Sequence, residues 1–202
     1  MNDSMNPIPD NAVLIIADVQ NGFLNENTDY LPGAINDFIT DYGKWFDEII
    51  MLKLENGDTA NYPVERNGKA GGARTLKNQY QSRLVPPLNR RHSTKLSHSS
   101  STDIHEIIEH INDRIVYLCG METDVNILPM ASVMINAGLE VNVIYDLTAT
   151  TIGTGVQIAM KPVLSHLLGE SHVIESITDT RTDRNDTDND NIDVMIPETD
   201  AA

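Results

Sequence analysis

The hydrophobic residues of this chain fall into two patterns that alternate along the sequence. In the first, apolar residues form a short continuous run, which is typical of a strand buried on both faces. In the second, they recur every three or four residues, which is typical of an amphipathic helix. The predicted strands are residues 12–17, 49–54, 114–119, 140–145 and 172–177, and the predicted helices are residues 33–46, 102–111, 124–137 and 153–168. This alternation predicts an α/β fold with three layers, in which a mostly parallel, doubly wound sheet carries helices on both faces.

Glycine, proline and hydroxyl side chains mark the ends of these elements. Ser101 or Thr102 is a candidate N-cap for the second helix, and Gly138 occupies the C′ position after the third. Residues 56–90 contain four glycines and three prolines but little periodicity. We therefore expect a long loop between the second strand and the second helix.

The length of the chain favours one domain followed by a tail. A chain of 202 residues suits a single domain, which we place at residues 1–177. Residues 178–191 contain no apolar side chain, so this stretch cannot bury enough surface to offset the entropy of ordering. We expect residues 178–202 to form an acidic, flexible tail.

Charge is unevenly distributed along the chain. The formal net charge is −16, which disfavours binding to nucleic acid or to an anionic membrane. Residues 61–100, in contrast, contain eight Lys and Arg against one Glu, a local charge of +7. A solvated loop region is the simplest interpretation of this segment. The alternatives are a region that attracts a small anionic substrate, and a region that binds the acidic tail of a neighbouring subunit in a homo-oligomer.

The chain has a single cysteine, Cys119, at the end of a predicted strand. One cysteine can form neither an intrachain disulfide nor a zinc site of the Cys-x-x-Cys kind. The N-terminal residues do not resemble a signal peptide, and no apolar run approaches the roughly 18 residues that span a bilayer. We therefore expect a cytoplasmic protein.

Three predicted strands are followed by residues that suit a ligand site. Asp18 follows strand 12–17, Gly120 follows strand 114–119 and Asp146 follows strand 140–145. Ligands of open parallel sheets bind beyond the carboxyl ends of the strands, so we expect these residues to gather at one place. A carboxylate that follows a buried strand is costly unless it is paired, which makes Asp18 a candidate acid–base residue.

Short motifs at these strand ends resemble a known family. The sequence DVQNGF at 18–23 follows an apolar strand, Lys95 precedes a serine-rich segment, and GMETDV at 120–125 precedes a helix. The sequence AGLEV at 137–141 then leads to DLTA at 146–149. Together these motifs resemble the isochorismatase-like, or cysteine hydrolase, superfamily over most of the chain.

The resemblance implies an active site with one departure from the family. In the family an Asp and a Lys, here Asp18 and Lys95, flank a cysteine nucleophile at the start of the helix after the glycine turn. That position is Asn126 in this chain, and Cys119 lies seven residues earlier, where a lone cysteine is typical of a small core residue. A carboxamide is a poor nucleophile, so thioester intermediates of nicotinamidase type are excluded. The resemblance also implies substrate contacts from Gln20, Phe23, Met121, Glu122 and Thr123.

Two functions fit this departure. Isochorismatases proper also lack the cysteine, and they hydrolyse a vinyl ether with the Asp and the Lys retained. By this resemblance Asp18 would move the proton, Lys95 would orient Asp18 and stabilise anionic charge, and Asn126 would donate a hydrogen bond to an oxyanion or a carboxylate. We therefore expect a hydrolase for a small carboxylate-bearing substrate. The alternative is a pseudoenzyme, whose fold and pocket serve as a binding or assembly module.

We expect neither a metal nor another cofactor. Nicotinamidases carry an Asp and His cluster for a divalent metal after the second strand, whereas this chain has no histidine before His92. His105 and His110 are five residues apart, off the i, i+4 face that helical metal ligands need. We expect His92, His98, His105 and His110 to be surface imidazoles.

Overall fold

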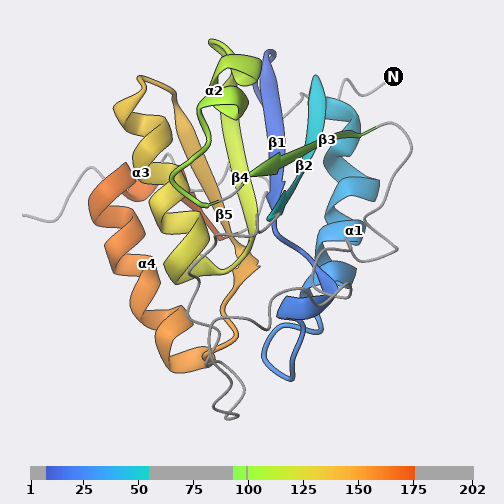
Figure 1. The fold of residues 1–202 in the computed structure, drawn as a ribbon, viewed down its shortest axis with the longest axis vertical. Coiled ribbons are helices and arrows are strands. Elements are labelled where there is room, and N and C mark those ends of the chain that lie inside the picture. Colours follow the sequence, from blue (N-terminus) through green and yellow to red (C-terminus); the bar gives the residue numbers. More distant parts are fainter. Residues whose placement is uncertain (1–7, 55–92, 99, 176–202) are drawn as a thin grey trace, which may run out of the picture.

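The computed structural model describes residues 8–54, 93–98 and 100–175, and it arranges them around one parallel sheet (Figure 1). Within this part of the chain the sheet has six strands in the order β3-β2-β1-β4-β5-β6. The strands are β1 (Ala12–Ala17), β2 (Glu48–Leu54), β3 (Thr94–His98), β4 (Ile115–Met121), β5 (Val141–Ala149) and β6 (Val173–Ile174). The strand order reverses between β1 and β4, and such a switch point is where ligands of open α/β sheets bind.

Helices cover both faces of the sheet. The helices are α1 (Leu31–Tyr42), α2 (His105–Ile111), α3 (Leu128–Asn136) and α4 (Thr154–Leu168). The residues of β1 alternate between two cores. Leu14 and Ile16 pack in the core that contains α1, whereas Val13 and Ile15 pack in the core that contains residues of α2, α3 and α4. The predicted fold class, a three-layer parallel α/β domain, is therefore confirmed.

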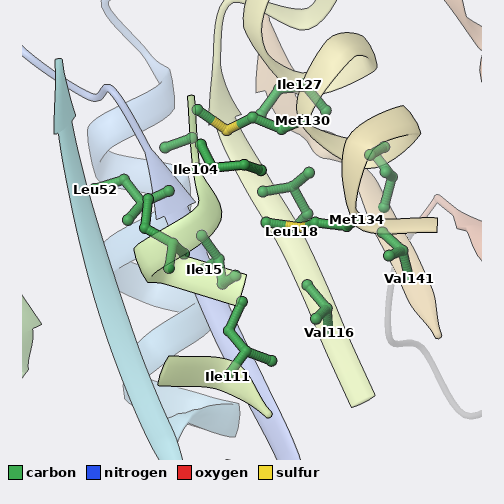
Figure 2. Close-up of a cluster of buried hydrophobic side chains, with 14 of the residues drawn as sticks. Ile15, Leu52, Ile104, Ile111, Val116, Leu118, Ile127, Met130, Met134 and Val141 are labelled. Carbon is green, nitrogen blue, oxygen red and sulfur yellow. The ribbon is translucent and has the colours of Figure 1, made fainter. Parts of the chain in front are cut away.

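The core beneath α2 and α3 fixes the part of the sheet next to the switch point. Figure 2 shows Ile15 of β1 and Leu118 of β4 facing Ile104, Met130 and Met134, and all five side chains are at most 1% exposed. Burial of one such side chain contributes about 1.5–3 kcal/mol. This packing holds the carboxyl ends of β1 and β4 in a fixed relation.

The pattern of hydrophobic residues does not predict β3. Thr94, Leu96 and His98 are partly or fully buried, whereas Lys95 and Ser97 are exposed. This alternation is typical of a strand with one covered face. Because Leu96 is the only large apolar residue among the five, no continuous run marks the strand.

The start of α2 also differs from the prediction. The helix begins at His105, and its N-cap residue is Ile104, with no capping side chain. Neither Ser101 nor Thr102 caps this helix. The Ser101 hydroxyl instead donates a hydrogen bond to the carbonyl oxygen of Val125, 3.0 Å away, and so joins this segment to the turn that follows β4.

β5 continues past its predicted end at Tyr145 and reaches Ala149. Its pairing with β4 shifts register between Leu118 and Gly120, so residues of β5 bulge from the ladder there. Asp146 lies within this irregular part of the strand and is exposed. The prediction that Asp146 marks the carboxyl end of β5 is wrong, because the bulge lets the strand continue beyond it.

The remaining predictions concern the ends of the chain and its long loop. Gly138 follows α3 with a φ of 87°, as expected of a C′ glycine. The strand predicted at 172–177 is the two-residue β6. The loop predicted at 56–90 and the tail predicted at 178–202 lie outside the described residues. None of the described helices is long and apolar enough to cross a membrane.

Candidate active site

The carboxylate of Asp18 is buried at the carboxyl end of β1 and contacts a histidine. Ala17 pairs with Leu52 of β2 and with Gly120 of β4, so the next residue, Asp18, lies at the inner edge of the sheet. Its Oδ1 is 2.8 Å from Nε2 of His98, the last residue of β3, and both side chains are 0% exposed. The structure thus forms an acid–base pair from two strands that are far apart in sequence.

The second ring nitrogen of His98 shows how many protons the pair holds. Nδ1 lies 2.9 Å from the carbonyl oxygen of Ser100. A carbonyl oxygen only accepts, so Nδ1 must carry a hydrogen. The hydrogen bond between Nε2 and Asp18 then contains one further proton, which belongs either to the imidazolium or to the carboxylic acid. The pair therefore shares that proton and titrates as a unit.

Both members of the pair have altered acidity. Burial raises the pKa of Asp18, and the hydrogen bond and positive charge of His98, together with the backbone N–H of Leu54, oppose this effect only in part. Burial lowers the pKa of His98, but the hydrogen bond and charge of Asp18, the carbonyl of Ser100 and the charge of Asp103 together outweigh burial, so the pKa of His98 is raised. Both shifts favour retention of the shared proton as the pH rises.

The other carboxylate oxygen of Asp18 has a different environment. Oδ2 is buried and receives no hydrogen bond from any residue that the structure describes. A buried oxygen without a donor is energetically costly. Oδ2 is therefore the carboxylate oxygen of Asp18 that His98 does not contact.

Lys95, the lysine expected beside Asp18, is exposed on β3. Side chains alternate across a strand, so residues three apart point to opposite faces. Because His98 turns toward Asp18, Lys95 lies on the other face. The structure therefore gives Asp18 a histidine where the resemblance implied a lysine.

The expectation of four surface histidines is wrong at one position. His105 and His110 are exposed as expected, whereas His98 is 5% exposed. His92 lies outside the described residues. The sequence signal for His98 is weak: it ends a short polar–apolar alternation just before a serine-rich segment.

Asn126, the residue that the resemblance aligns with the family cysteine, lies in the turn that follows β4. It is 1% exposed, and its Nδ2 donates a hydrogen bond to the carbonyl oxygen of Met121, 3.2 Å away. The turn is π-helical over Thr123–Ile127, and the Met121–Glu122 peptide before it is cis.

Two contacts connect this turn to the Asp18–His98 pair. His98 contacts the Ser100 carbonyl, and the next residue, Ser101, donates to the carbonyl oxygen of Val125. The main chain of β4 also approaches β1 closely, since a Cβ on Gly120 would lie 2.1 Å from the carbonyl oxygen of Ala17. Asn126 and the Asp18–His98 pair thus belong to one connected region.

The residues expected to contact substrate have other partners within the protein. The Gln20 amide bonds to both backbone groups of Leu54, at 2.9 and 3.3 Å. Thr123 donates to Gln157 at 2.7 Å. Phe23 is partly buried against the core beneath α1, and Met121 is fully buried within that core.

Glu122 links the site turn to the loop after β5. Its side chain is fully buried. Its Oε2 accepts a hydrogen bond from the backbone N–H of Thr151 at 2.8 Å and another from the hydroxyl of Thr150 at 3.1 Å. These bonds fix the position of the cis peptide relative to the carboxyl end of β5.

The single thiol of the chain, Cys119, is buried in the core and does not have the chemistry of a catalytic cysteine. Cys119 is 0% exposed within the core beneath α1, and burial raises its pKa. The expectation that Cys119 is a small core residue is confirmed. A thiol that stays protonated is neither a nucleophile nor a metal ligand. Among the described residues, no three His, Cys, Asp or Glu side chains cluster as metal ligands would.

The fold and the site together define a three-layer parallel α/β domain with a buried acid–base pair at the carboxyl end of an inner strand. The Isochorismatase domain family matches residues 12–168, which is more than half of the 202 residues. The chain belongs to the isochorismatase family of hydrolases, and the expected resemblance is confirmed.

Solved structures with the same fold include nicotinamidases and an isochorismatase-like hydrolase. Nicotinamidase PncA from Bacillus subtilis is 14% identical, with 82% of this chain and 99% of that chain covered and a TM-score of 0.63. The yeast nicotinamidase Pnc1p is 16% identical, with 82% and 100% covered and a TM-score of 0.61. An isochorismatase-like hydrolase from Alkaliphilus metalliredigens is 14% identical, with 77% and 91% covered and a TM-score of 0.60. The comparison with curated proteins gave no match.

Proposed function

We propose that this protein hydrolyses a small carboxylate-bearing substrate by acid–base chemistry at Asp18, without a cysteine nucleophile. The observation that carries the proposal is the buried pair of Asp18 and His98, 2.8 Å apart. General acid catalysis needs a proton donor whose pKa is near the working pH. Burial raises the pKa of Asp18 toward that range.

An enol ether is the substrate type that suits this pair. Asp18 would transfer its proton to the vinyl carbon of the ether, and water would add to the resulting oxocarbenium carbon. The adduct would then collapse to an alcohol and a ketone, and the proton that water releases would return to the pair. His98 would donate from Nε2 to Oδ1 throughout, so the transferred proton would be a second one, carried on Oδ2, and the proton that water releases would return to Oδ2.

Amide donors of the site would hold the substrate carboxylate, and the positive charge of the basic residues would attract it. Asn126 supplies an amide donor at the position where most family members have a thiol, and the neighbouring turn amides are further candidates. Lys95 and the other bases of residues 61–100 give that stretch a charge of +7, which would attract an anion. In this proposal Lys95 attracts the anionic substrate, and His98 positions Asp18 by its hydrogen bond to Oδ1.

A pseudoenzyme is the second candidate, because one observation favours it. Both side chains of the pair are 0% exposed, and the amide of Asn126 already donates to the carbonyl of Met121. A site closed in this way suits a domain that has kept the fold and lost turnover. Such a domain would bind or assemble without converting a small molecule.

Turnover measurements separate the two candidates. Purified protein is incubated with isochorismate and a panel of related enol ethers and amides, beside the variant Asp18→Asn, which keeps the shape of the side chain and removes its acid. We expect enol-ether hydrolysis by the wild type and a loss of at least a hundredfold in the variant, since acid–base residues contribute about 10²–10⁴-fold. Equal turnover by the two proteins contradicts the mechanism, and no turnover by the wild type favours the pseudoenzyme.

A further inference from the structure

The side chain of Gln20 takes the place of a backbone carbonyl at the end of the sheet. In a parallel ladder, a residue that donates its N–H to the neighbouring strand accepts from that strand two residues further on. Asp18 donates its N–H to the carbonyl oxygen of Leu52 at 3.2 Å, so a regular ladder would have the Asp18 carbonyl accept from Leu54. The Leu54 N–H instead donates to Oε1 of Gln20 at 2.9 Å.

The backbone conformation of Asp18 explains this exchange. Asp18 has a φ of 55°, in the left-handed region that Asp enters more readily than most residues. The chain leaves the ladder at this point, and the Asp18 carbonyl accepts from the N–H of Gln20 at 2.7 Å. The Gln20 side chain also donates from Nε2 to the Leu54 carbonyl at 3.3 Å. A side-chain amide therefore replaces a peptide group between β1 and β2.

Leu54 lies between the two members of the acid–base pair. β2 separates β1 from β3 in the sheet, and Leu54 pairs with His98 of β3. The contact between Asp18 and His98 therefore spans the end of β2 at Leu54. Because Gln20 is 1% exposed, water does not readily replace its bonds to Leu54. Gln20 thus holds the strand end over which the pair forms.

The Leu54 N–H also acts on the Asp18 carboxylate. Burial raises the pKa of Asp18, and among the influences that oppose burial the Leu54 N–H is the weakest. A weak influence is expected where Gln20 is the main acceptor of this N–H. A buried N–H without an acceptor is costly, so loss of the Gln20 oxygen would turn the Leu54 N–H toward Asp18. A further donor on a carboxylate favours its ionised form.

We propose that Gln20 is a positioning residue, which accepts the Leu54 N–H and so keeps this donor from the carboxylate that must carry the reactive proton. The inference rests on the proposed acid–base function of Asp18. It gives Gln20 a role within the protein, whereas the family resemblance implied a contact with substrate. In both roles the side chain is a carboxamide, and the difference lies in the group to which it bonds.

Several charged groups lie on the elements around the pair, and substitution of Gln20 alters none of them. They are Lys53 on β2, Lys95 and His98 on β3, Asp103 before α2, and Glu122 and Asp124 in the turn after β4. Lys53 and Lys95 point to the face opposite Leu54 and His98, because side chains alternate along a strand. A changed titration of Asp18 in an uncharged Gln20 variant would therefore arise from hydrogen bonding.

The titration of Asp18 tests this inference without a substrate. Its carboxyl carbon is followed by NMR in the full chain, and the signal is identified by its loss in Asp18→Asn. Gln20→Met keeps the length of the side chain and removes both polar groups. We expect the pH midpoint of Asp18 to fall by about one unit in this variant, because a gained backbone donor stabilises the ionised carboxylate.

Two further variants distinguish this effect from general damage. Gln20→Glu keeps an oxygen for the Leu54 N–H and adds a negative charge when ionised, so the Asp18 midpoint should lie at or above the wild-type value. Asn142→Leu removes another buried carboxamide, which contacts His172 at 3.0 Å. Asn142 lies on β5, two strands from β1, so we expect no change. A lower midpoint in all three variants would overturn the inference.

The remaining outcomes also decide the matter. An unchanged midpoint in Gln20→Met would overturn the inference, and a raised KM with that unchanged midpoint would assign Gln20 to substrate binding. If Gln20→Met does not fold, a midpoint below the wild-type value in Gln20→Glu would overturn the inference instead. Because the titration needs no turnover, a wild type that hydrolyses nothing would contradict the proposed function and not the role of Gln20.

Discussion

The protein contains two carboxylate–histidine pairs whose surroundings give them opposite properties. Asp18 and His98 meet at the carboxyl end of the sheet, and both side chains are 0% exposed. Glu48 and His110 meet at the amino end of β2, where the side chains are 19% and 40% exposed. The histidine is about 3 Å from the carboxylate in both pairs. The comparison shows that burial and additional partners, not the pair itself, determine whether a carboxylate holds a proton.

The additional partners of Glu48 are what set the two carboxylates apart. Partial burial raises the pKa of Glu48, but hydrogen bonds from Thr94, His110 and Arg114 outweigh it and lower the pKa to about 2. Arg114 approaches Oε2 to 2.6 Å. Among the described residues Asp18 has one side-chain donor, His98, and burial raises the pKa of Asp18. Glu48 is therefore a structural anion, whereas Asp18 is suited to proton transfer.

The largest difference between the pairs is expected in catalysis. His98→Gln keeps an amide donor for Asp18 but cannot share a proton, so we expect kcat to fall roughly a hundredfold. His110→Gln makes the same change in the exposed pair. It should leave kcat within about twofold, because that pair lies at the amino ends of the strands, away from the candidate site at their carboxyl ends. Steady-state kinetics on the substrate identified from the enol-ether panel measure both.

Lys95→Ala completes that series and compares the histidine with the lysine implied by the family. If Lys95 acts on substrate approach, its removal should raise KM more than it lowers kcat. A larger fall in kcat for Lys95→Ala than for His98→Gln would show that Lys95, and not His98, is the catalytic partner of Asp18.

A smaller difference is expected in stability against acid. The lowered pKa of Glu48 contributes stability above the unfolded value of 4.5, and this contribution is lost as the pH falls from 4.5 toward 2. After allowance for solvent screening, Glu48→Gln should lower the free energy of unfolding by about 1 kcal/mol at pH 7. Urea unfolding from pH 7 downward should show the gap between variant and wild type narrowing below pH 4.5.

A control variant distinguishes the effect of losing the Glu48 ion pair from the effect of losing one negative charge on the stability against acid. Asp47 is an exposed carboxylate next to Glu48 in sequence. Asp47→Asn removes the same charge without touching the contacts of Arg114 and His110. A gap of equal size in both variants would show that net charge, and not the pair, determines the acid sensitivity.

The parts of the fold that follow a strong pattern could be predicted from the sequence. β1 is a continuous apolar run, and its predicted bounds at 12–17 are those observed. β3 could not be found in this way, because it is an edge strand with a single large apolar residue, Leu96. The bulge of β5 arises from pairing with β4, which local sequence does not encode.

Only part of the candidate site could be predicted from the sequence. Asp18 is marked by its place directly after a buried strand, and Cys119 by its place within one. His98 could not be identified, since its role depends on β3 pairing with β2 so that His98 lies opposite Leu54. Lys95 lies on the same strand, but its side chain points to the opposite face of the sheet. A shift of the strand by one residue would exchange the faces to which the Lys95 and His98 side chains point.

The shared proton of Asp18 and His98 can be observed directly by imidazole nitrogen NMR as a function of pH, in wild type and in Asp18→Asn. In the wild type the pKa of His98 should lie above its ordinary value of 6.5. In Asp18→Asn the negative partner is gone while burial remains, so the pKa of His98 should fall below its wild-type value. A His98 that titrates at its ordinary value in both proteins would contradict the account, because no proton would then be shared.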